Sequence, residues 1–357
     1  MNKLNAYIRI DTMDYLRGFS LLGVLLVNSY QVMNNVGIYN EFHDELYSIF
    51  NRKFYPILFF LFGFGSYLFM NRSKQKTKNK YLLFLRRIGF LFVLGLIHIF
   101  YAPSGINDVL MVYAVLGLFI AMFFKCNKWN NLIVTITLIV LSIVTAFCQP
   151  VYDGRIVWLE LLSNISKWLS LMMLGFTMGQ FKFFENIYGK LKYISIFLIV
   201  TIFAYPSLFY IQKLIVITPA GHEILEDYIV SSMIISSLLI ILQWDKAKVI
   251  FSPIKYYGQM SLTNYLAQSV LLIVFSLIIG SVPINSLIIC FIIHTILIVF
   301  SIIWLRFFNM GPAELLLRYF TYWGKISNEK QLLKKVLMKE PLYKEILNSI
   351  SLTYYTL

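Results

Sequence analysis

The stretch NRSKQKTKNKYLLFLRRIGFLFVLGLIHIFY, residues 71–101, decides the fold class of this chain. A series of lysines and arginines ends at Arg87, and the residues that follow are apolar apart from His98. This pattern is typical of a membrane-spanning helix that begins next to a positively charged cytoplasmic loop. The whole chain is similarly apolar, because 59% of its 357 residues are hydrophobic and 13% are charged. We therefore predict an all-α, polytopic integral membrane protein.

The apolar stretches, when divided at charges, prolines and glycines, predict about ten transmembrane helices. They cover residues 18–33, 54–70, 88–101, 109–124, 132–149, 168–181, 193–212, 228–243, 262–280 and 287–308. With a cytoplasmic N-terminus, the outer loops contain five of the 31 lysines and arginines, which are Arg52, Lys53, Arg155, Lys167 and Lys213. Because positive charge accumulates on the cytoplasmic side, this distribution predicts a multi-pass cell-membrane protein with both termini in the cytoplasm.

Residues 1–324 are expected to form one membrane domain, and residues 325–357 a basic cytoplasmic tail that faces lipid headgroups. The topology explains the net charge of +14, and no basic stretch alternates with stacking aromatic residues, so we expect no nucleic-acid partner. The three cysteines are scattered, which argues against disulfides and against a metal centre. Acidic residues in the leader and the polar residues after it favour an uncleaved first helix over a signal peptide.

His98 raises the question of function. If the third helix leaves the cytoplasmic side at Ile88, His98 lies about 15 Å along it, near the middle of a hydrocarbon core of ~30 Å. Ionisable residues at this depth are costly and often mark function. A neutral imidazole with a carboxylate on its second nitrogen is suited to act as a general base. The structural alternative is a buried histidine that only bonds a neighbouring helix.

Asp108 is the carboxylate nearest to His98 in the sequence. The apolar run stops at Tyr101, and the next helix, 109–124, is short, so the hairpin should turn beneath the outer surface. Backbone in such a turn has to be buried in protein or line a watery cavity, which would place Asp108 above His98. Alternatively, Asn107 or Asp108 caps the following helix, and the two roles are compatible.

A second polar group lies in the stretch RIDTMDYLRGFSLLGVLLVN, residues 9–28. Its charged residues are Arg9, Asp11, Asp14 and Arg17. The i, i+3 spacing of Asp14 and Arg17 predicts an ion pair, whereas simple positive-inside anchoring would not explain two acids. Asn28 should lie about 16 Å deeper than Arg17, at a depth similar to that of His98. It is predicted either to face the same cavity or to join two helices by a hydrogen bond.

Two further stretches are expected on the cytoplasmic side. YYGQMSLTNYLAQS, residues 256–269, places Asn264 and Gln268 four residues apart on one helix face. In NMGPAELLLRYFTYWGK, residues 309–325, Gly311-Pro312 should begin a helix. The same stretch spaces Glu314 and Arg318 as an i, i+4 pair, for which a cap or a surface ion pair is the structural explanation.

These stretches resemble known proteins. The leader Arg-x-Asp-x-x-Asp-x-x-Arg-Gly-Phe, followed by LLGVLLVN, resembles the start of YeiB-like proteins, whose C-terminal half is catalogued as a domain of unknown function. FYPILFFLFGFGSYL (54–68), RRIGFLFVLGLIHIFY with a following Asp, YGQMSLTNYLAQS and GPAELLLRYFTY are similar to that family's blocks in the same order. The resemblance extends from residue 9 to about residue 324.

The family is grouped with transmembrane acyltransferases. The resemblance therefore implies a membrane-embedded enzyme that passes an acyl group, expected to be acetyl, from cytoplasmic acyl-CoA to an acceptor on the far side. A cell-envelope glycan or a lipid-linked sugar would be such an acceptor. The superfamily's intramembrane histidine corresponds to His98, with His294 as the fallback. This chain has YAPSGINDV where a Trp-x-Gly-Asp-like pattern usually follows, so Asp108 is offset.

The resulting hypothesis assigns three catalytic roles: His98 deprotonates the acceptor, Asp108 orients the imidazole and Asn28 holds the oxyanion. The residues expected to bind acyl-CoA are Arg9, Asp11, Asp14, Arg17, Arg87, Asn264, Gln268 and Arg318, and no metal is expected. The alternatives are a secondary transporter with a His/Asp proton relay and a structural partner in envelope assembly. The sequence leaves open the acceptor, the acyl chain length, an acyl-histidine intermediate and the formation of a homo-oligomer.

Overall fold

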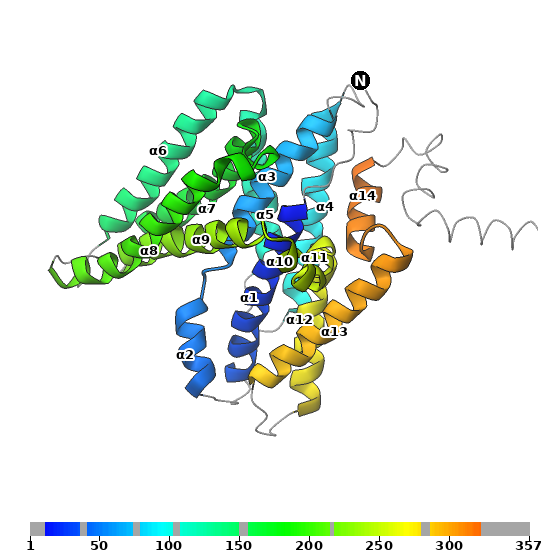
Figure 1. Cartoon of the computed structure of the whole chain (residues 1–357). Coiled ribbons are helices and arrows are strands. Elements are labelled where there is room, and N and C mark those ends of the chain that lie inside the picture. The colour runs from blue at the N-terminus through cyan, green and yellow to red at the C-terminus, as the bar shows by residue number, and fades with distance from the viewer. Residues whose placement is uncertain are drawn as a thin grey trace, which may run out of the picture.

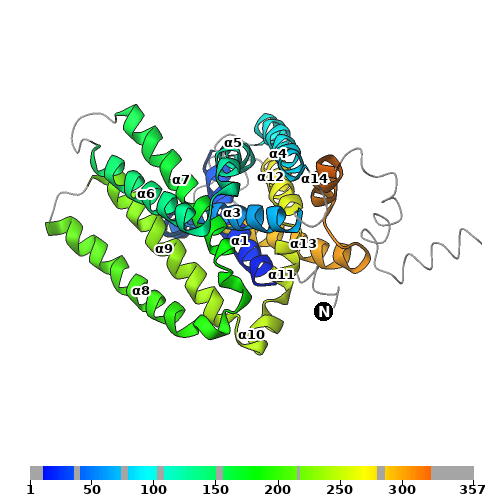
Figure 2. The same cartoon turned by 90° about the horizontal axis from the view of Figure 1, so that it is seen from above.

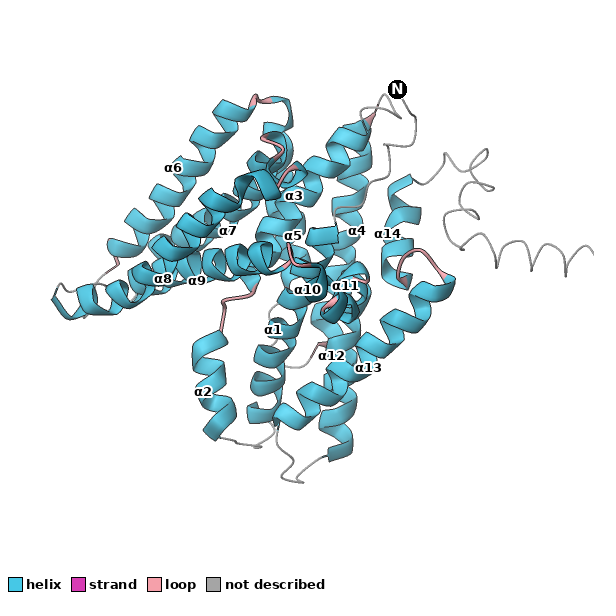
Figure 3. Cartoon of the chain, in the orientation of Figure 1, coloured by secondary structure: helices cyan, strands magenta, loops and turns pink. Residues whose placement is uncertain are grey.

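The computed structural model describes residues 11–35, 41–73, 79–102, 108–149, 156–214, 218–279 and 286–322, which are helical apart from short loops and turns (Figures 1 and 3). The long helices are α1 (Asp11–Asn35), α3 (Tyr55–Ser73), α4 (Lys80–Tyr101), α5 (Val109–Met122), α6 (Lys128–Phe147), α7 (Val157–Gln180), α8 (Leu191–Leu214), α9 (Pro219–Ile241), α12 (Ser261–Ile279) and α13 (Ser286–Phe307). The shorter helices are α2 (Glu41–Phe50), α10 (Asp245–Ile250), α11 (Ser252–Gln259) and α14 (Pro312–Tyr322).

The predicted all-α fold is confirmed, and the predicted apolar segments fall on helices in the described part of the chain. The predicted number of about ten transmembrane helices stays a prediction. Within the described residues, 6 helical segments are long and apolar enough to cross a membrane. They are Lys80–Tyr101, Lys128–Phe147, Tyr188–Gln212, Pro219–Ile241, Ser261–Ile278 and Ser286–Phe307. Large apolar side chains point outward from several of them, such as Phe100 at 90% exposure and Phe203 at 69%. The chain is a multi-pass integral membrane protein, because such a surface is stable only against lipid.

The helices form two groups that meet at α3 (Figure 2). Helices α6 to α9 lie on one side, and α4, α5, α12 and α14 lie on the other. Two glycines allow α3 and α7 to cross closely: a Cβ on Gly63 would lie 1.8 Å from the Met172 carbonyl oxygen, and one on Gly175 would lie 1.9 Å from that of Phe60. Small residues permit such backbone approach between helices in membranes.

Two of the predicted segments begin too late. The predicted helices 168–181 and 228–243 begin at Val157 and Pro219 in the structure, as α7 and α9. The assignment of Lys167 to a loop is therefore wrong, because this residue lies inside α7. An isolated charge is costly in lipid, which is why the sequence predicts a helix boundary at Lys167. In the structure this lysine forms an ion pair with Asp227 and lies inside the helix.

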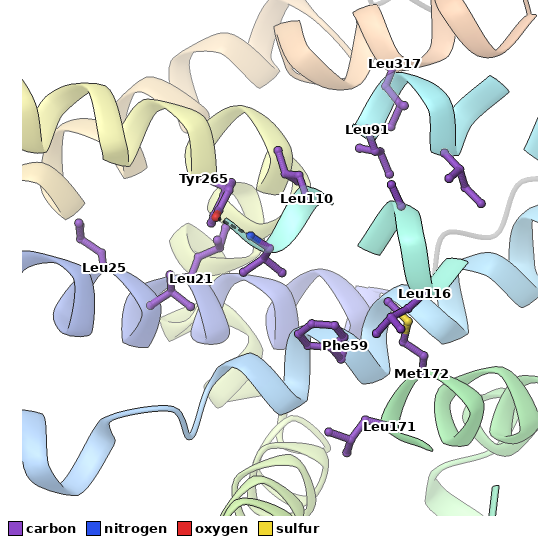
Figure 4. Close-up of a cluster of buried hydrophobic side chains, with 14 of the residues drawn as sticks. Leu21, Leu25, Phe59, Leu91, Leu110, Leu116, Leu171, Met172, Tyr265 and Leu317 are labelled. Atoms are coloured by element: carbon purple, nitrogen blue, oxygen red, sulfur yellow. Dashed lines mark hydrogen bonds between the residues drawn. The ribbon is translucent and has the colours of Figure 1, made fainter. Parts of the chain in front are cut away.

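A hydrophobic core surrounds the middle of α1 and fixes the helices next to it. Figure 4 shows Leu21, Leu25, Phe59, Leu91, Leu110, Leu116, Leu171, Met172, Tyr265 and Leu317, which come from α1, α3, α4, α5, α7, α12 and α14. The hydroxyl of Tyr265 accepts a hydrogen bond from the backbone N–H of Val109 at 3.2 Å, which attaches α12 to the beginning of α5. Because this core is closely packed, it holds α4, α5 and α12, and the polar side chains that they carry, at fixed positions.

Candidate functional site

His98 lies in the last turn of α4 with 0% of its surface exposed. Its Nε2 atom forms a hydrogen bond of 2.8 Å with Oγ of Ser269. Its Nδ1 atom lies 2.9 Å from Oδ1 of Asp108, an ion-pair distance at which neither atom is aligned for a hydrogen bond. The rings of Tyr101 and Tyr265 pack against the imidazole with centroid distances of 5.3 and 5.1 Å. Both ring nitrogens therefore face polar groups from other parts of the chain inside an apolar core.

The two carboxylate oxygens of Asp108 make two different interactions. Its Oδ2 atom accepts a hydrogen bond from the backbone N–H of Met111 at 2.7 Å, so the residue is the N-cap of α5. Its Oδ1 atom faces His98, and only 3% of the side chain is exposed. Gly95 makes room for this arrangement, since a Cβ there would lie 2.7 Å from the Met111 nitrogen and 2.8 Å from Oδ2 of Asp108. Capping and contact with the imidazole therefore coexist in one carboxylate.

Ser269 is a member of the site that sequence analysis missed. Its hydroxyl bonds His98 and makes no other hydrogen bond within the described residues. Other serines behave differently: Ser276 of α12 donates to the Ile273 carbonyl oxygen at 2.8 Å, and Ser301 of α13 donates to that of Leu297 at 2.7 Å. A serine in an apolar helix ordinarily bonds its own backbone in this way, so the sequence carried no signal for Ser269.

A group of tyrosines lies next to this centre. Asn28 is 1% exposed, and its Oδ1 atom accepts a hydrogen bond from the Tyr55 hydroxyl at 3.1 Å. The hydroxyl of Tyr113 is buried and has no hydrogen-bond partner in the described part of the chain. Tyr113 and Tyr265 lie within electrostatic range of each other, of Tyr55 and of Asp108. Such a buried, unpaired hydroxyl is costly unless a ligand or a water uses it.

Two arginines contribute positive charge near this group of tyrosines. Arg17 forms the predicted ion pair with Asp14, at 3.2 Å. The charge of Arg17 is within electrostatic range of both Arg87 on α4 and Tyr113 on α5. Arg87 lies over the ring of Phe69 at 5.6 Å and has no carboxylate at ion-pair distance among the described residues. Two guanidinium groups that repel each other across helices form a favourable place for an anion.

Asn264 and Gln268 are buried in helix packing on the other side of α12. The amide nitrogen of Asn264 donates to the Tyr257 carbonyl oxygen at 2.8 Å, and that of Gln268 donates to the Leu21 carbonyl oxygen at 3.1 Å. Their own carbonyl oxygens are buried and have no hydrogen-bond partner in the described residues. Both side chains therefore join α12 to α11 and α1, and their predicted contact with a cofactor stays a prediction.

The other described residues singled out in the sequence make no contact with His98. Asp11 pairs with Lys255 of α11 at 2.5 Å. Glu314 accepts hydrogen bonds from the backbone N–H groups and a hydroxyl in the first turn of α12, instead of pairing with Arg318. Arg318 makes no ion pair within the described residues, and Arg9 lies outside them, as does the predicted tail 325–357.

A second polar cluster, between α3, α7 and α9, was not predicted. The Nζ atom of Lys167 lies 2.9 Å from Asp227, and these side chains are 0% and 1% exposed. Lys53, just before α3, reaches Asp227 at 3.3 Å and Glu226 at 2.8 Å. Charges buried at this depth persist only when they are paired. Among the described residues, no group of three or more His, Cys, Asp or Glu side chains is placed to hold a metal ion.

Comparisons with known proteins place the chain in a family. The family model described as "Protein of unknown function (DUF418)" matches residues 182–324. The chain is 33% identical over 347 residues to the "Uncharacterized 39.9 kDa protein in amylase 3'region" of Bacillus acidopullulyticus, with 88% of this chain and 94% of the relative covered. It is 26% identical over 396 residues to the "Uncharacterized protein YxaH" of Bacillus subtilis (strain 168), with 90% and 96% covered. This multi-pass membrane protein therefore belongs to the DUF418 family and is similar to proteins from two bacilli.

Proposed function

We propose that this protein is a membrane-embedded acyltransferase. It transfers an acyl group, expected to be acetyl, from cytoplasmic acyl-CoA to a hydroxyl or amine of a cell-envelope glycan or lipid-linked sugar. The observation that supports this proposal is the buried imidazole of His98, with a carboxylate 2.9 Å from one nitrogen and a hydroxyl 2.8 Å from the other.

The arrangement around His98 suits proton transfer. A carboxylate at Nδ1 favours the tautomer that carries its proton there, which leaves the Nε2 lone pair available as a base. When Nε2 takes a proton, the charge of Asp108 stabilises the resulting imidazolium. Because both side chains are buried, this electrostatic interaction is stronger than it would be in water. His98 and Asp108 therefore have the roles that general-base catalysis of acyl transfer needs.

Other groups near His98 support the binding of the two ends of acyl-CoA. Arg17 and Arg87 present guanidinium groups of the kind that bind phosphates through two parallel hydrogen bonds. The unpaired hydroxyl of Tyr113 and the side-chain amide of Asn28 are the donors available for the oxyanion of a tetrahedral intermediate. In this proposal both termini are cytoplasmic, so the arginines face the compartment that holds acyl-CoA.

The burial of His98 defines a step of the mechanism. Its side chain has 0% exposure, so substrates reach it only when neighbouring side chains of α4, α5 and α12 move apart. Tyr101 and Tyr265 pack on the ring and are the first side chains that have to move. Opening motions of this kind occur on microsecond to millisecond timescales and limit turnover in many enzymes. Once these side chains have closed over the bound substrate, the site excludes water, which would otherwise hydrolyse a thioester.

The protein purified in detergent should consume radiolabelled acetyl-CoA and release the CoA thiol. His98→Ala should abolish transfer and leave CoA binding intact, because the arginines are unchanged. His294→Ala is the matched comparison: this half-buried histidine bonds the Leu22 carbonyl oxygen at 3.2 Å instead of facing a carboxylate. Full activity of His98→Ala would remove His98 from the mechanism, and loss of activity only in His294→Ala would move the base there. A protein that never consumes the thioester is not an acyltransferase.

A secondary transporter is the second candidate. The buried cluster of Lys53, Lys167, Glu226 and Asp227 supports it, because ionisable groups inside a membrane often form proton or ion paths. A transporter would move solute into liposomes in response to a pH gradient without using acetyl-CoA. Thioester consumption that depends on His98, with no solute flux, would exclude this alternative.

A further inference from the structure

We propose that Ser269 carries the acyl group as a covalent ester, so that transfer proceeds in two half-reactions. This proposal rests on the proposed acyl transfer and adds the nucleophile to it. Its basis is the order of three side chains from three parts of the chain: Asp108 at the beginning of α5, His98 on α4 and Ser269 on α12. A carboxylate, an imidazole and a hydroxyl in this order form the arrangement that activates a serine nucleophile on unrelated folds.

The contacts of the Ser269 hydroxyl distinguish it from a structural serine. Ser276 and Ser301 donate their protons to carbonyl oxygens of their own helices. The Ser269 hydroxyl instead faces Nε2 of His98 at 2.8 Å, and no backbone oxygen competes for it within the described residues. In the neutral tautomer that carries its proton at Nδ1, on the side of Asp108, Nε2 is the acceptor and Ser269 is the donor. The hydroxyl proton therefore points to the atom that would remove it.

In the first half-reaction, Oγ of Ser269 attacks the carbonyl carbon of the thioester while Nε2 of His98 takes the hydroxyl proton. The bond between the carbonyl carbon and sulfur then breaks, and the CoA thiolate leaves as a thiol with the proton from His98. In the second half-reaction, His98 removes a proton from the acceptor hydroxyl or amine, which attacks the ester carbon. Oγ leaves and recovers its proton from His98, so atoms and charges balance without an oxidant or a reductant.

A covalent intermediate also fits the burial of the site. Ser269 is 1% exposed and His98 is 0% exposed, so a thioester and a large acceptor would have difficulty reaching the imidazole together. An acyl-serine allows the two substrates to use the site one after the other, from opposite sides of the membrane. We therefore expect ping-pong kinetics, in which CoA is released before the acceptor binds.

The test is to incubate the detergent-purified protein with radiolabelled acetyl-CoA without an acceptor. The wild-type protein should release a burst of about one CoA thiol per chain and retain the label as an ester, which peptide mass spectrometry should locate on Ser269. Ser269→Ala should lose the label and the burst, and its kcat should fall by at least ~10³-fold. Ser269→Cys should trap the label as a thioester, which neutral hydroxylamine cleaves and a serine ester resists.

Ser276→Ala is the matched control, because it removes a hydroxyl from the same helix that bonds only a backbone oxygen. CoA binding and a monodisperse elution profile should show that each variant is folded. A label on His98, or Ser269→Ala with activity near that of the wild type, would overturn the acyl-serine and leave the acyltransferase intact. A wild-type protein that never cleaves the thioester would instead overturn the proposed function itself.

Discussion

The double role of Asp108 leads to a prediction that separates stability from catalysis. One oxygen caps α5 through the backbone N–H of Met111 at 2.7 Å, and the other lies 2.9 Å from Nδ1 of His98. In Asp108→Asn, the amide oxygen can keep the cap, and the NH₂ group then faces His98. Asn and Asp are equally good caps, so the stability should change by less than about 1 kcal/mol.

The effect of Asp108→Asn on activity should be much larger. An amide NH₂ group donates a hydrogen bond and cannot accept one from an N–H at Nδ1. The imidazole is therefore forced into the tautomer that carries its proton on Nε2. This tautomer cannot act as the base, and the equivalent change in a serine protease lowers kcat by about 10⁴-fold. Asp108→Ala should lose the same activity and also the cap, at about 1 kcal/mol, and it leaves a buried imidazole N–H unpaired, at about 1–3 kcal/mol.

The two variants can be compared by unfolding in detergent with increasing denaturant and by the rate of label transfer from acetyl-CoA. We expect nearly equal losses of activity but a difference in unfolding free energy of roughly 1–4 kcal/mol between the two variants. Full activity of Asp108→Asn would show that the carboxylate only caps the helix. Equal destabilisation of both variants would show that the amide does not preserve the cap, and the separation of roles would be refuted.

Three further predictions concern packing and buried charge. Gly95→Ala should destabilise the protein by about 1–3 kcal/mol, because the new methyl would meet the start of α5, whereas Gly89→Ala on the same helix meets nothing within 4 Å and should be neutral or stabilising; thermal unfolding of both variants checks this. Lys167→Ala should cost about 3 kcal/mol, because Asp227 would keep one cation instead of two; the double variant Lys167→Met, Asp227→Leu should recover most of this loss in denaturant titrations. Burial raises the pKa of the Glu314 carboxyl above its usual value, so the folded state holds this proton more tightly than the unfolded state does. Its contribution to stability is therefore present below the unfolded pKa and lost as the pH rises through the folded pKa, and Glu314→Gln should flatten that part of a plot of Tm against pH.

Local patterns were sufficient for the helical class and for individual helices. The apolar run 88–101, which contains His98, predicted α4, and the i, i+3 spacing of Asp14 and Arg17 predicted their ion pair. The same kind of reasoning allowed Asp108 to cap α5, as it does. These features depend on residues within one or two turns of each other, and the solvent for an apolar helix is apparent from its composition.

Only the tertiary structure could show which helices meet. Ser269 is separated from His98 by 171 residues, and the Asp227 that neutralises Lys167 is 60 residues away. In lipid, an apolar helix face packs equally well against many partners, and the choice depends on close glycine crossings and on polar groups that must find each other. The sequence alone does not distinguish a lysine that is paired inside the protein from one that is exposed to water. It therefore predicted Lys167 in a loop, whereas the fold buries this residue in α7 next to Asp227.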